Sequence, residues 1–314
     1  FRDIAVFYSR IYNTKVALID VSPSFESYYN IKAKKYSYLK FLNDNNNKNE
    51  FLIVDTRRLY FKRKLHLYFS DILIDNIKNS FENGKKVVLI QNRKGFASFV
   101  QCNICGYIEK CKNCDITLVY HKDINSLICH ICGFKKNLTT LCPFCFNNAM
   151  LIKGIGTERI EEDIKILFPD KRVLRLDSEV LSSLLSKNKI LRQLETEDYD
   201  IIVATQIYNN FFDFIKKNIG CIAFIDFDKF LNIPDFRAYE KAFQLLSEIY
   251  YYYDNIKIII QTSEIENTFF KFLRNFSYEN FYNFFIKERR EFFYPPFSRI
   301  LKIELIHKNK NVLI

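Results

Sequence analysis

The sequence carries CNIC at residues 102–105, CKNC at 111–114, CHIC at 129–132 and CPFC at 142–145, all within one short segment. A Cys-x-x-Cys turn can place two thiolates on one metal ion, and four such turns supply the eight ligands of two closed tetrahedral sites. Sites made of sulfur alone leave no open position for a catalytic water. The segment therefore predicts two structural zinc ions (Zn2+) in a small insert.

The spacing between the turns indicates which of them share a metal. The first two turns are separated only by residues 106–110, a tight span for one tetrahedron. Cys114 and Cys129 are separated by fourteen residues, close to the usual spacing of a zinc ribbon. We therefore predict nested sites, in which the outer zinc is held by Cys102, Cys105, Cys142 and Cys145 and the inner zinc by Cys111, Cys114, Cys129 and Cys132.

Residues next to the cysteines carry further expectations. Gly106 and Gly133 follow a second cysteine, where a positive φ relieves the turn, and Asp115 tolerates that conformation. Phe146 adopts it less easily, so we expect the last turn to be the weakest. His121 and His130 are expected outside the coordination spheres, and Cys221 is expected in the core.

Composition limits the class of protein. The chain has 314 residues, 48% hydrophobic and 26% charged, which is ordinary for a soluble protein of about two domains. No apolar run reaches the roughly eighteen residues of a membrane span, so we expect no membrane contact. The first residues lack the pattern of an export signal, which predicts a cytoplasmic protein with reduced thiols.

The charge balance favours an anionic partner. Lys and Arg exceed Asp and Glu by 47 to 36, giving a net charge of +11, and the pI of about 9.1 is common among nucleic-acid-binding proteins. Part of this basicity reflects a skew toward Lys, Asn, Ile, Phe and Tyr that AT-rich codons produce. Charge is therefore secondary support for DNA binding.

The flanks of the cysteine segment alternate between strand and helix patterns, which predicts a doubly wound α/β domain interrupted after its first strand. Strands are expected at 15–22, 51–55, 86–91, 173–176, 200–204, 219–227, 257–261 and 300–306, and helices at 25–33, 71–82, 157–167, 189–195 and 236–253. Thr157 is the expected N-cap of its helix. Beyond Thr262 the chain should be helical and aromatic-rich as far as Glu291.

Several flanking stretches keep a distinctive order over nearly the whole chain. They read SPSFES at 22–27, NRKGFA at 92–97, GIGTER at 154–159, TQ at 205–206, PDFRAYEK at 234–241, FQLL at 243–246 and YPPFS at 294–298. In this order they resemble one family, primosomal protein N′, the PriA replication-restart DNA helicases of bacteria.

The resemblance implies a superfamily 2 motor with two RecA-like lobes of the P-loop NTPase type, ATP between the lobes, and two zinc ions inserted in the second lobe. It assigns 1–50 to the end of the first lobe and a linker, 51–100 and 149–262 to the second lobe, 101–148 to the zinc insert, and 263–314 to a truncated C-terminal domain.

The function implied is that of an ATP-dependent 3′-5′ DNA helicase, which binds stalled forks and promotes reloading of the replicative helicase. The implied partners are forked or single-stranded DNA, primosome proteins, single-strand-binding protein and the replicative helicase. Arg93, Lys94 and Phe96 match the strand-tracking surface, since cations neutralise phosphates and an aromatic ring stacks on a base. A plain basic loop explains these three residues equally well.

The motor residues match less well. No P-loop for ATP and no acidic box for Mg2+ occurs in the chain, and both precede Phe1 in the family. The family's G-T-Q-M-x-x-K-G-x-D-F is ATQIYNNFFDF at 204–214, without the Lys and its following Gly. Its A-G-R-A-G-R has become YYYYDN at 250–255, which removes two phosphate-facing arginines and predicts severely reduced ATP turnover. We expect the tyrosine run simply to continue a helix.

The nucleotide-facing candidates that the resemblance leaves are Thr205, Gln206, Asp213 and Arg237. Arg237 and Glu240 lie three residues apart on one helix and could instead pair with each other. The basic runs KRK at 62–64 and KERR at 287–290 are expected to be solvated.

Three functions therefore remain open on the sequence alone. The chain is part of a fork-remodelling helicase, a zinc-bearing DNA or primosome scaffold without ATPase activity, or a decaying fragment.

Overall fold

The computed structural model describes residues 2–40, 49–61, 65–66, 68–91, 99–113, 117–121, 124–129, 132–153, 156–176, 192, 199–205, 218–233 and 235–301. The chain divides into two compact units. The sheet unit comprises 49–229, 255–267 and 302–314, and the aromatic unit comprises 1–48, 230–254 and 268–301.

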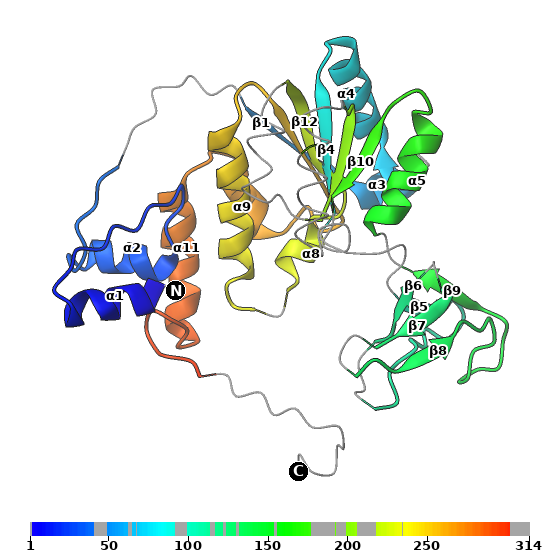
Figure 1. Cartoon of the computed structure of the whole chain (residues 1–314), viewed down its shortest axis with the longest axis horizontal. Helices are drawn as coiled ribbons and strands as arrows, with labels where there is room; N and C mark the ends of the chain where they lie inside the picture. The colour runs from blue at the N-terminus through cyan, green and yellow to red at the C-terminus, as the bar shows by residue number, and fades with distance from the viewer. Residues whose placement is uncertain are drawn as a thin grey trace. The chain divides into compact units, whose positions relative to one another are not determined.

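The sheet unit is built on six parallel strands in the order β1-β13-β12-β4-β11-β10 (Figure 1). The strands are β1 (Glu50–Asp55), β4 (Lys86–Ile90), β10 (Val173–Leu176), β11 (Ile201–Ala204), β12 (Ile219–Phe224) and β13 (Lys257–Thr262). The central strands β4, β11 and β12 are buried along almost their whole length, as continuous apolar runs in a parallel sheet require. The predicted α/β class is confirmed.

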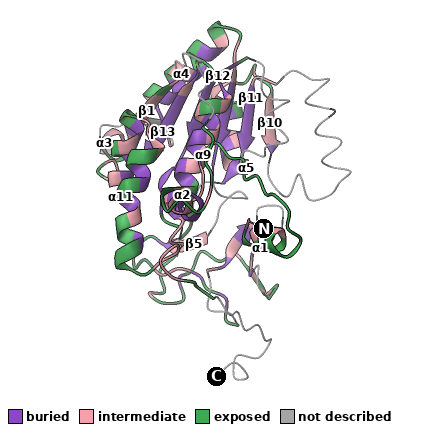
Figure 2. Ribbon diagram, turned by 90° about the vertical axis from the view of Figure 1, so that its left-hand side faces the viewer, coloured by how far each residue is buried: buried purple, intermediate pink, exposed green. Residues whose placement is uncertain are grey.

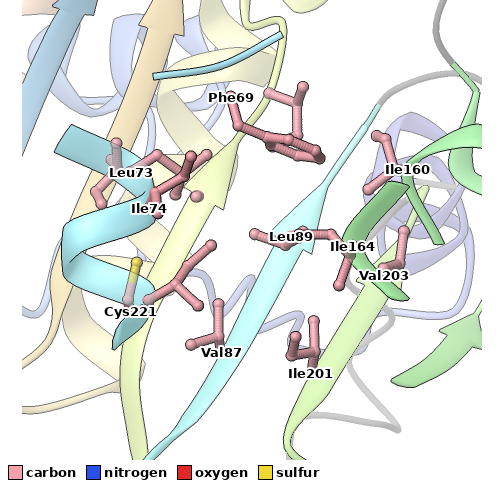
Figure 3. Close-up of a cluster of buried hydrophobic side chains, with 14 of the residues drawn as sticks. Phe69, Leu73, Ile74, Val87, Leu89, Ile160, Ile164, Ile201, Val203 and Cys221 are labelled. Carbon is pink, nitrogen blue, oxygen red and sulfur yellow. The ribbon is translucent and has the colours of Figure 1, made fainter. Parts of the chain in front are cut away.

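Helices α4 (Asp71–Glu82) and α5 (Thr157–Leu167) pack on this sheet. Their apolar side chains meet those of the strands in one cluster, in which Leu73, Ile160 and Ile164 are fully buried (Figure 3). Ser70 caps α4 by accepting a hydrogen bond from the N–H of Leu73 at 3.1 Å. The core of the unit therefore forms from residues whose periodicity is visible in the sequence.

Two further local features refine the expectations for this unit. Gly156, which has extended backbone, is the N-cap of α5, so the prediction of Thr157 as cap is wrong and Thr157 is buried in the first turn. Gly220 lies in β12 beside α4, where an added Cβ would come within 2.6 Å of Ser80 Oγ. Only glycine fits that close approach of strand and helix.

The remaining short elements before α4 are α3 (Thr56–Phe61) and the antiparallel pair β2 (Leu65–His66) and β3 (Phe69–Ser70). All of the helix predicted at 189–195 except Arg192, and most of the strand predicted at 300–306, lie outside the described residues.

The cysteine segment forms its own small fold. β5 (Phe99–Cys102) and β9 (Met150–Lys153) pair antiparallel and bring the two ends of the segment together. Between them, β6 (Val119–His121), β7 (Ser126–Ile128) and β8 (Lys135–Asn137) form a three-stranded antiparallel sheet. The segment follows β4, which is the second strand of the parallel sheet in chain order. The prediction that it follows the first strand is wrong because β1 also belongs to that sheet.

The aromatic unit contains α1 (Arg2–Ile11), α2 (Phe25–Lys32), α9 (Ala238–Tyr252), η1 (Thr268–Phe270), α10 (Lys271–Arg274) and α11 (Tyr278–Glu291), while α8 (Asp228–Leu231) lies at the boundary. Phe25, Phe243, Phe269 and Phe281 are fully buried, and Phe243 stacks on Phe281 with ring centroids 4.1 Å apart. Figure 2 shows the mixture of buried and exposed positions along α11. The predicted aromatic helical region up to Glu291 is confirmed.

The segment predicted as a strand at 15–22 has no regular structure, so that prediction is wrong. Leu18 and Ile19 are exposed there. A β-strand needs a hydrogen-bonding neighbour, and none of the described strands pairs with this segment. None of the helices within the described ranges is long and apolar enough to cross a membrane.

Candidate metal centre

The outer cysteine cluster joins the two ends of the small fold. The Sγ atoms of Cys102 and Cys145 lie 3.6 Å apart, and those of Cys105 and Cys142 are separated by the same distance. All four sulfurs lie within 4.8 Å of one another. The first and last turns of the segment therefore converge on one point.

The inner cluster brings together the two middle turns. Cys111 Sγ and Cys132 Sγ are 3.6 Å apart, and Cys129 Sγ lies within 4.8 Å of both. Cys114, the fourth predicted ligand, lies outside the described residues, as does His130. Among the cysteines that the structure places, the nested pairing is the one that the spacing predicts.

Three of the turns share the same backbone geometry. The N–H of the residue after the second cysteine donates to the carbonyl of the first, at 3.0 Å for Gly106, 2.9 Å for Gly133 and 3.0 Å for Phe146. These residues have φ angles of +76°, +72° and +56°. Phe146 thus adopts the conformation that glycine prefers, because the turn requires a positive φ at this position. We had expected phenylalanine to disfavour that conformation.

The distances fit zinc and exclude disulfides. Sulfurs about 2.3 Å from a tetrahedral zinc lie about 3.8 Å apart, close to the spacing in both clusters, whereas a disulfide needs about 2.05 Å. The outer cluster groups four cysteine sulfurs, and the inner cluster groups three among the described residues. The two clusters form zinc sites, and in the outer one four sulfurs leave no open coordination position.

The outer thiols would not all ionise without a cation. Hydrogen bonds from the side chain and backbone of Asn147 lower the pKa of Cys145 to about 6. The N–H of Tyr107 acts to lower the pKa of Cys105, but desolvation and the neighbouring sulfurs raise it to about 12. A divalent cation offsets the repulsion between neighbouring thiolates and holds all four outer sulfurs in the thiolate form.

Groups around the inner cluster orient its sulfurs. The backbone N–H of Asn113 lies 3.4 Å from Cys111 Sγ, and its side-chain amide lies 3.7 Å from Cys132 Sγ. Nearby in the sequence, Glu109 is buried and pairs with Lys136 Nζ at 2.6 Å. These contacts were not predicted, because asparagine and glutamate beside a cysteine carry no distinctive pattern.

Cys221 is separate from both clusters. It lies fully buried in β12, where desolvation raises the pKa of its thiol to about 12. It is core, as predicted. His121 lies in β6, opposite Ser126 of β7, and belongs to neither group of clustered ligands within the described part of the chain.

The nucleotide and DNA candidates are only partly placed. Arg93, Lys94, Phe96, Gln206 and Asp213 lie outside the described residues. Thr205 directly follows β11, at the carboxyl end of the sheet, where ligands of open α/β sheets bind. It is buried, and its Oγ1 has no hydrogen-bond partner within the part of the chain that the structure describes.

Arg237 is held within the aromatic unit. Its guanidinium donates to Glu26 Oε1 at 2.8 Å, and Glu240 instead accepts a hydrogen bond from Arg289. The pairing of Arg237 with Glu240 that their spacing allows is therefore not observed. The α-helical spacing of Phe281, Phe285 and Arg289 places Arg289 on the buried face of α11, so the prediction of a solvated run is wrong for Arg289. Lys287, Glu288 and Arg290 are exposed, as predicted.

Comparison with known proteins agrees with the metal geometry. The family model described as the PriA DNA helicase Cys-rich region (CRR) domain matches residues 111–136, which span the inner cluster. That match covers the two turns that the spacing pairs with each other.

Similarity to full-length curated proteins covers far more of this chain than the family model does. The replication restart protein PriA of Borreliella burgdorferi is 31% identical over 314 residues, covering 98% of this chain and 46% of the relative. The protein of the same name from Bacillus subtilis is 29% identical over 98% of this chain and 38% of the relative. The one from Rickettsia felis is 30% identical over 100% and 49%. The chain thus spans less than half the length of these relatives, and over nearly all of its own length it is a homologue of the replication restart protein PriA.

Proposed function

We propose that this chain supplies the second RecA-like lobe and the zinc insert of an ATP-dependent 3′-5′ DNA helicase acting at stalled replication forks. The observation that carries the proposal is similarity to PriA proteins along almost the entire chain. The six-stranded parallel sheet and the two cysteine clusters support it. Its role in the cell would be to help reload the replicative helicase.

The nucleotide would be shared between this lobe and residues that the chain does not contain. No P-loop occurs in the sequence, so ATP and Mg2+ would be held chiefly by the first lobe. On this side, Thr205 directly follows β11 at the carboxyl end of the sheet, and Gln206 and Asp213 come after it in the sequence. We assign these three residues to face the nucleotide. Arg237 is less suited, because Glu26 already pairs with its guanidinium.

Exposed apolar residues near the start of the chain support a preceding lobe. The run KVALIDVS at 15–22 has the composition of a buried parallel strand, yet Val16, Leu18, Ile19 and Val21 are exposed. We assign this segment to the end of the first lobe, whose other residues would cover these side chains.

Fork DNA is the proposed substrate, with Arg93, Lys94 and Phe96 in contact with it. The net charge of +11 supports phosphate contacts. Single-strand-binding protein, other primosome proteins and the replicative helicase are proposed protein partners, and a cytoplasmic location follows from this role.

Salt titration of fork binding tests the DNA contacts. The logarithm of the association constant should fall linearly with the logarithm of salt concentration, and Arg93→Ala or Lys94→Ala should each reduce the slope by about 1. Lys165→Ala is the matched control, because Lys165 already pairs with Glu161 on an exposed helix face. Binding that is independent of salt would contradict the phosphate contacts.

A zinc-bearing scaffold without ATPase activity is the second candidate. The favouring observation is the stretch YYYYDN at 250–255, where Tyr252 and Asn255 stand in place of the two phosphate-facing arginines of the family. As predicted, α9 continues through Tyr252, and Tyr250 packs against Phe276 with ring centroids 4.7 Å apart. ATP hydrolysis by the longest natural form of the protein, with and without forked DNA, separates the candidates. Fork-stimulated turnover supports the helicase, whereas fork binding without turnover supports the scaffold.

A further inference from the structure

Large apolar side chains in and beside the two outer turns are exposed to solvent. Phe144 is 72% exposed, Phe146 76% and Ile104 66%, and all three lie in or directly after the outer turns. Leu141, just before Cys142, is 50% exposed. We call Ile104, Leu141, Phe144 and Phe146 the outer pole. All four belong to, or directly adjoin, the two turns whose sulfurs converge on the outer cluster.

Phe146 is the strongest indication that the outer pole acts on something outside the chain. Its φ of +56° is a conformation that costs a non-glycine residue about 1 kcal/mol or more. Gly106 and Gly133 hold the corresponding positions of two other turns. With three quarters of Phe146 exposed, its burial recovers little of that cost. Such outliers cluster at functional sites.

Phe144 is held ready for contact. Its ring stacks on Tyr107 with centroids 6.4 Å apart and planes 3° from parallel. Tyr107 packs in turn against the buried core of the zinc segment. The exposed face of Phe144 is therefore a positioned aromatic surface, which reduces the entropy lost when a partner packs on it.

The absence of charge near the outer pole selects the kind of partner. Residues 99–108 and 137–152 contain no Asp, Glu, Lys or Arg, although the chain as a whole carries +11. The inner turns, by contrast, lie among Lys110, Lys112 and Lys136. A phosphate backbone or an acidic peptide would need cations that these two stretches lack. An uncharged, apolar ligand needs none.

The size of the outer pole also limits the partner. Four side chains offer far less than the roughly 800 Å² that each subunit contributes to a stable protein interface. A second copy of this chain would therefore need additional contacts, whereas a short segment carrying one or two anchor side chains would not.

We propose that the outer pole binds a short, uncharged segment of another protein through aromatic or aliphatic side chains that pack on Phe144 and Phe146. The contact requires the zinc-held turns but neither ATP nor DNA. It goes beyond the proposed helicase function, since a chain that fails to bind forks can still bind this segment.

A random heptapeptide library displayed on phage is a suitable probe. It is selected against the zinc-loaded chain, and the enriched peptides are synthesised and titrated by fluorescence anisotropy. We expect enriched peptides rich in Phe, Leu or Tyr and free of charge, and an affinity loss of about tenfold or more for the double variant F144S/F146S. Ile166→Ser is the matched control, because Ile166 is an exposed apolar residue on α5. The affinity of this variant for the selected peptides should equal that of the wild type.

Three results would overturn the proposal. The first is no enrichment, or enrichment of charged peptides. The second is peptide binding that F144S/F146S leaves intact. The third is binding of a thymidine oligonucleotide, or dimerisation in sedimentation equilibrium, that the double variant abolishes while no peptide is selected. Zinc content and fork binding are measured on every variant, so that misfolding and loss of the proposed DNA function are distinguished from loss of this contact.

Discussion

Arg237 and Glu26 form a salt bridge of 2.8 Å between residues 211 positions apart in the sequence. Arg289 approaches the same carboxylate at 3.6 Å, bonds to Glu240, and donates to the carbonyl of Pro295 at 3.1 Å. Three of the stretches that carry the family resemblance, at 22–27, 234–241 and 294–298, therefore meet at one buried ion cluster. The ion pairs and hydrogen bonds among these three stretches hold the aromatic unit together.

Removing Arg289 should destabilise the aromatic unit strongly. Arg289→Met leaves two buried carboxylates with less compensation, and the loss of one partner of a buried pair costs about 3–5 kcal/mol. Urea unfolding followed by tyrosine fluorescence measures the change. Arg290→Met is the control, because Arg290 is exposed on the same helix and should change the free energy of unfolding by about 0.5 kcal/mol or less. Equal effects of the two variants would contradict the buried cluster.

Glu26 should make stability depend on acid pH. Burial acts to raise the pKa of Glu26, but the Arg237 hydrogen bond and further charges outweigh it and lower that pKa. A lowered folded pKa gives stability that is present above the unfolded value of about 4.3 and is lost as pH falls toward the folded pKa. The difference in unfolding free energy between the wild type and Glu26→Gln should therefore shrink below about pH 4.3.

The matched control for that prediction is Glu291→Gln, at the exposed end of α11. Its difference from the wild type should stay nearly constant over the same pH range. A wild-type advantage over Glu26→Gln that grows on acidification would show that the sign assigned to Glu26 is wrong.

Zinc content should fall in single steps when either cluster is broken. We expect two zinc ions per chain, one after Cys142→Ser and one after Cys129→Ser, as measured by elemental analysis of the purified protein. Cys221→Ala should retain both ions, since Cys221 is buried in the parallel sheet. Loss of both ions from Cys142→Ser with the inner fold intact would show that the clusters are not separate sites.

The left-handed residues of the outer turns should respond in opposite directions. Phe146→Gly removes backbone strain and should stabilise the zinc segment by about 1 kcal/mol, whereas Gly106→Ala should destabilise it by a similar amount. An added Cβ at Gly106 meets no atom within 4 Å, so its effect is conformational. The rate of zinc transfer to a chelator, measured for each of the two variants and the wild type, reports these changes in stability. Slower zinc transfer from Gly106→Ala than from the wild type would show that a left-handed non-glycine residue does not weaken these turns. The expectation that the turn ending at Phe146 is the weakest would then be wrong.

Much of the metal centre and the sheet could be predicted because their patterns are local. The two residues inside each Cys-x-x-Cys turn and the fourteen between Cys114 and Cys129 restrict which sulfurs can meet. Likewise, the apolar runs in β4 and β12 indicate burial on both faces of a strand. Where local patterns mislead, as at residues 15–22, the reason is that a strand also needs a neighbour.

The sequence alone established the nested zinc pairing, the parallel α/β class and the family resemblance, since all three depend on spacing along the chain. The tertiary structure alone decided that Arg289 is buried, that Arg237 pairs with Glu26 rather than Glu240, and that Phe146 takes a left-handed conformation with its ring in solvent. The physical reason is that ion pairing and burial depend on which distant segments pack together. The left-handed conformation of Phe146 accompanies the turn hydrogen bond from its N–H to the carbonyl of Cys142, and the exposure of its ring depends on which segments pack beside it.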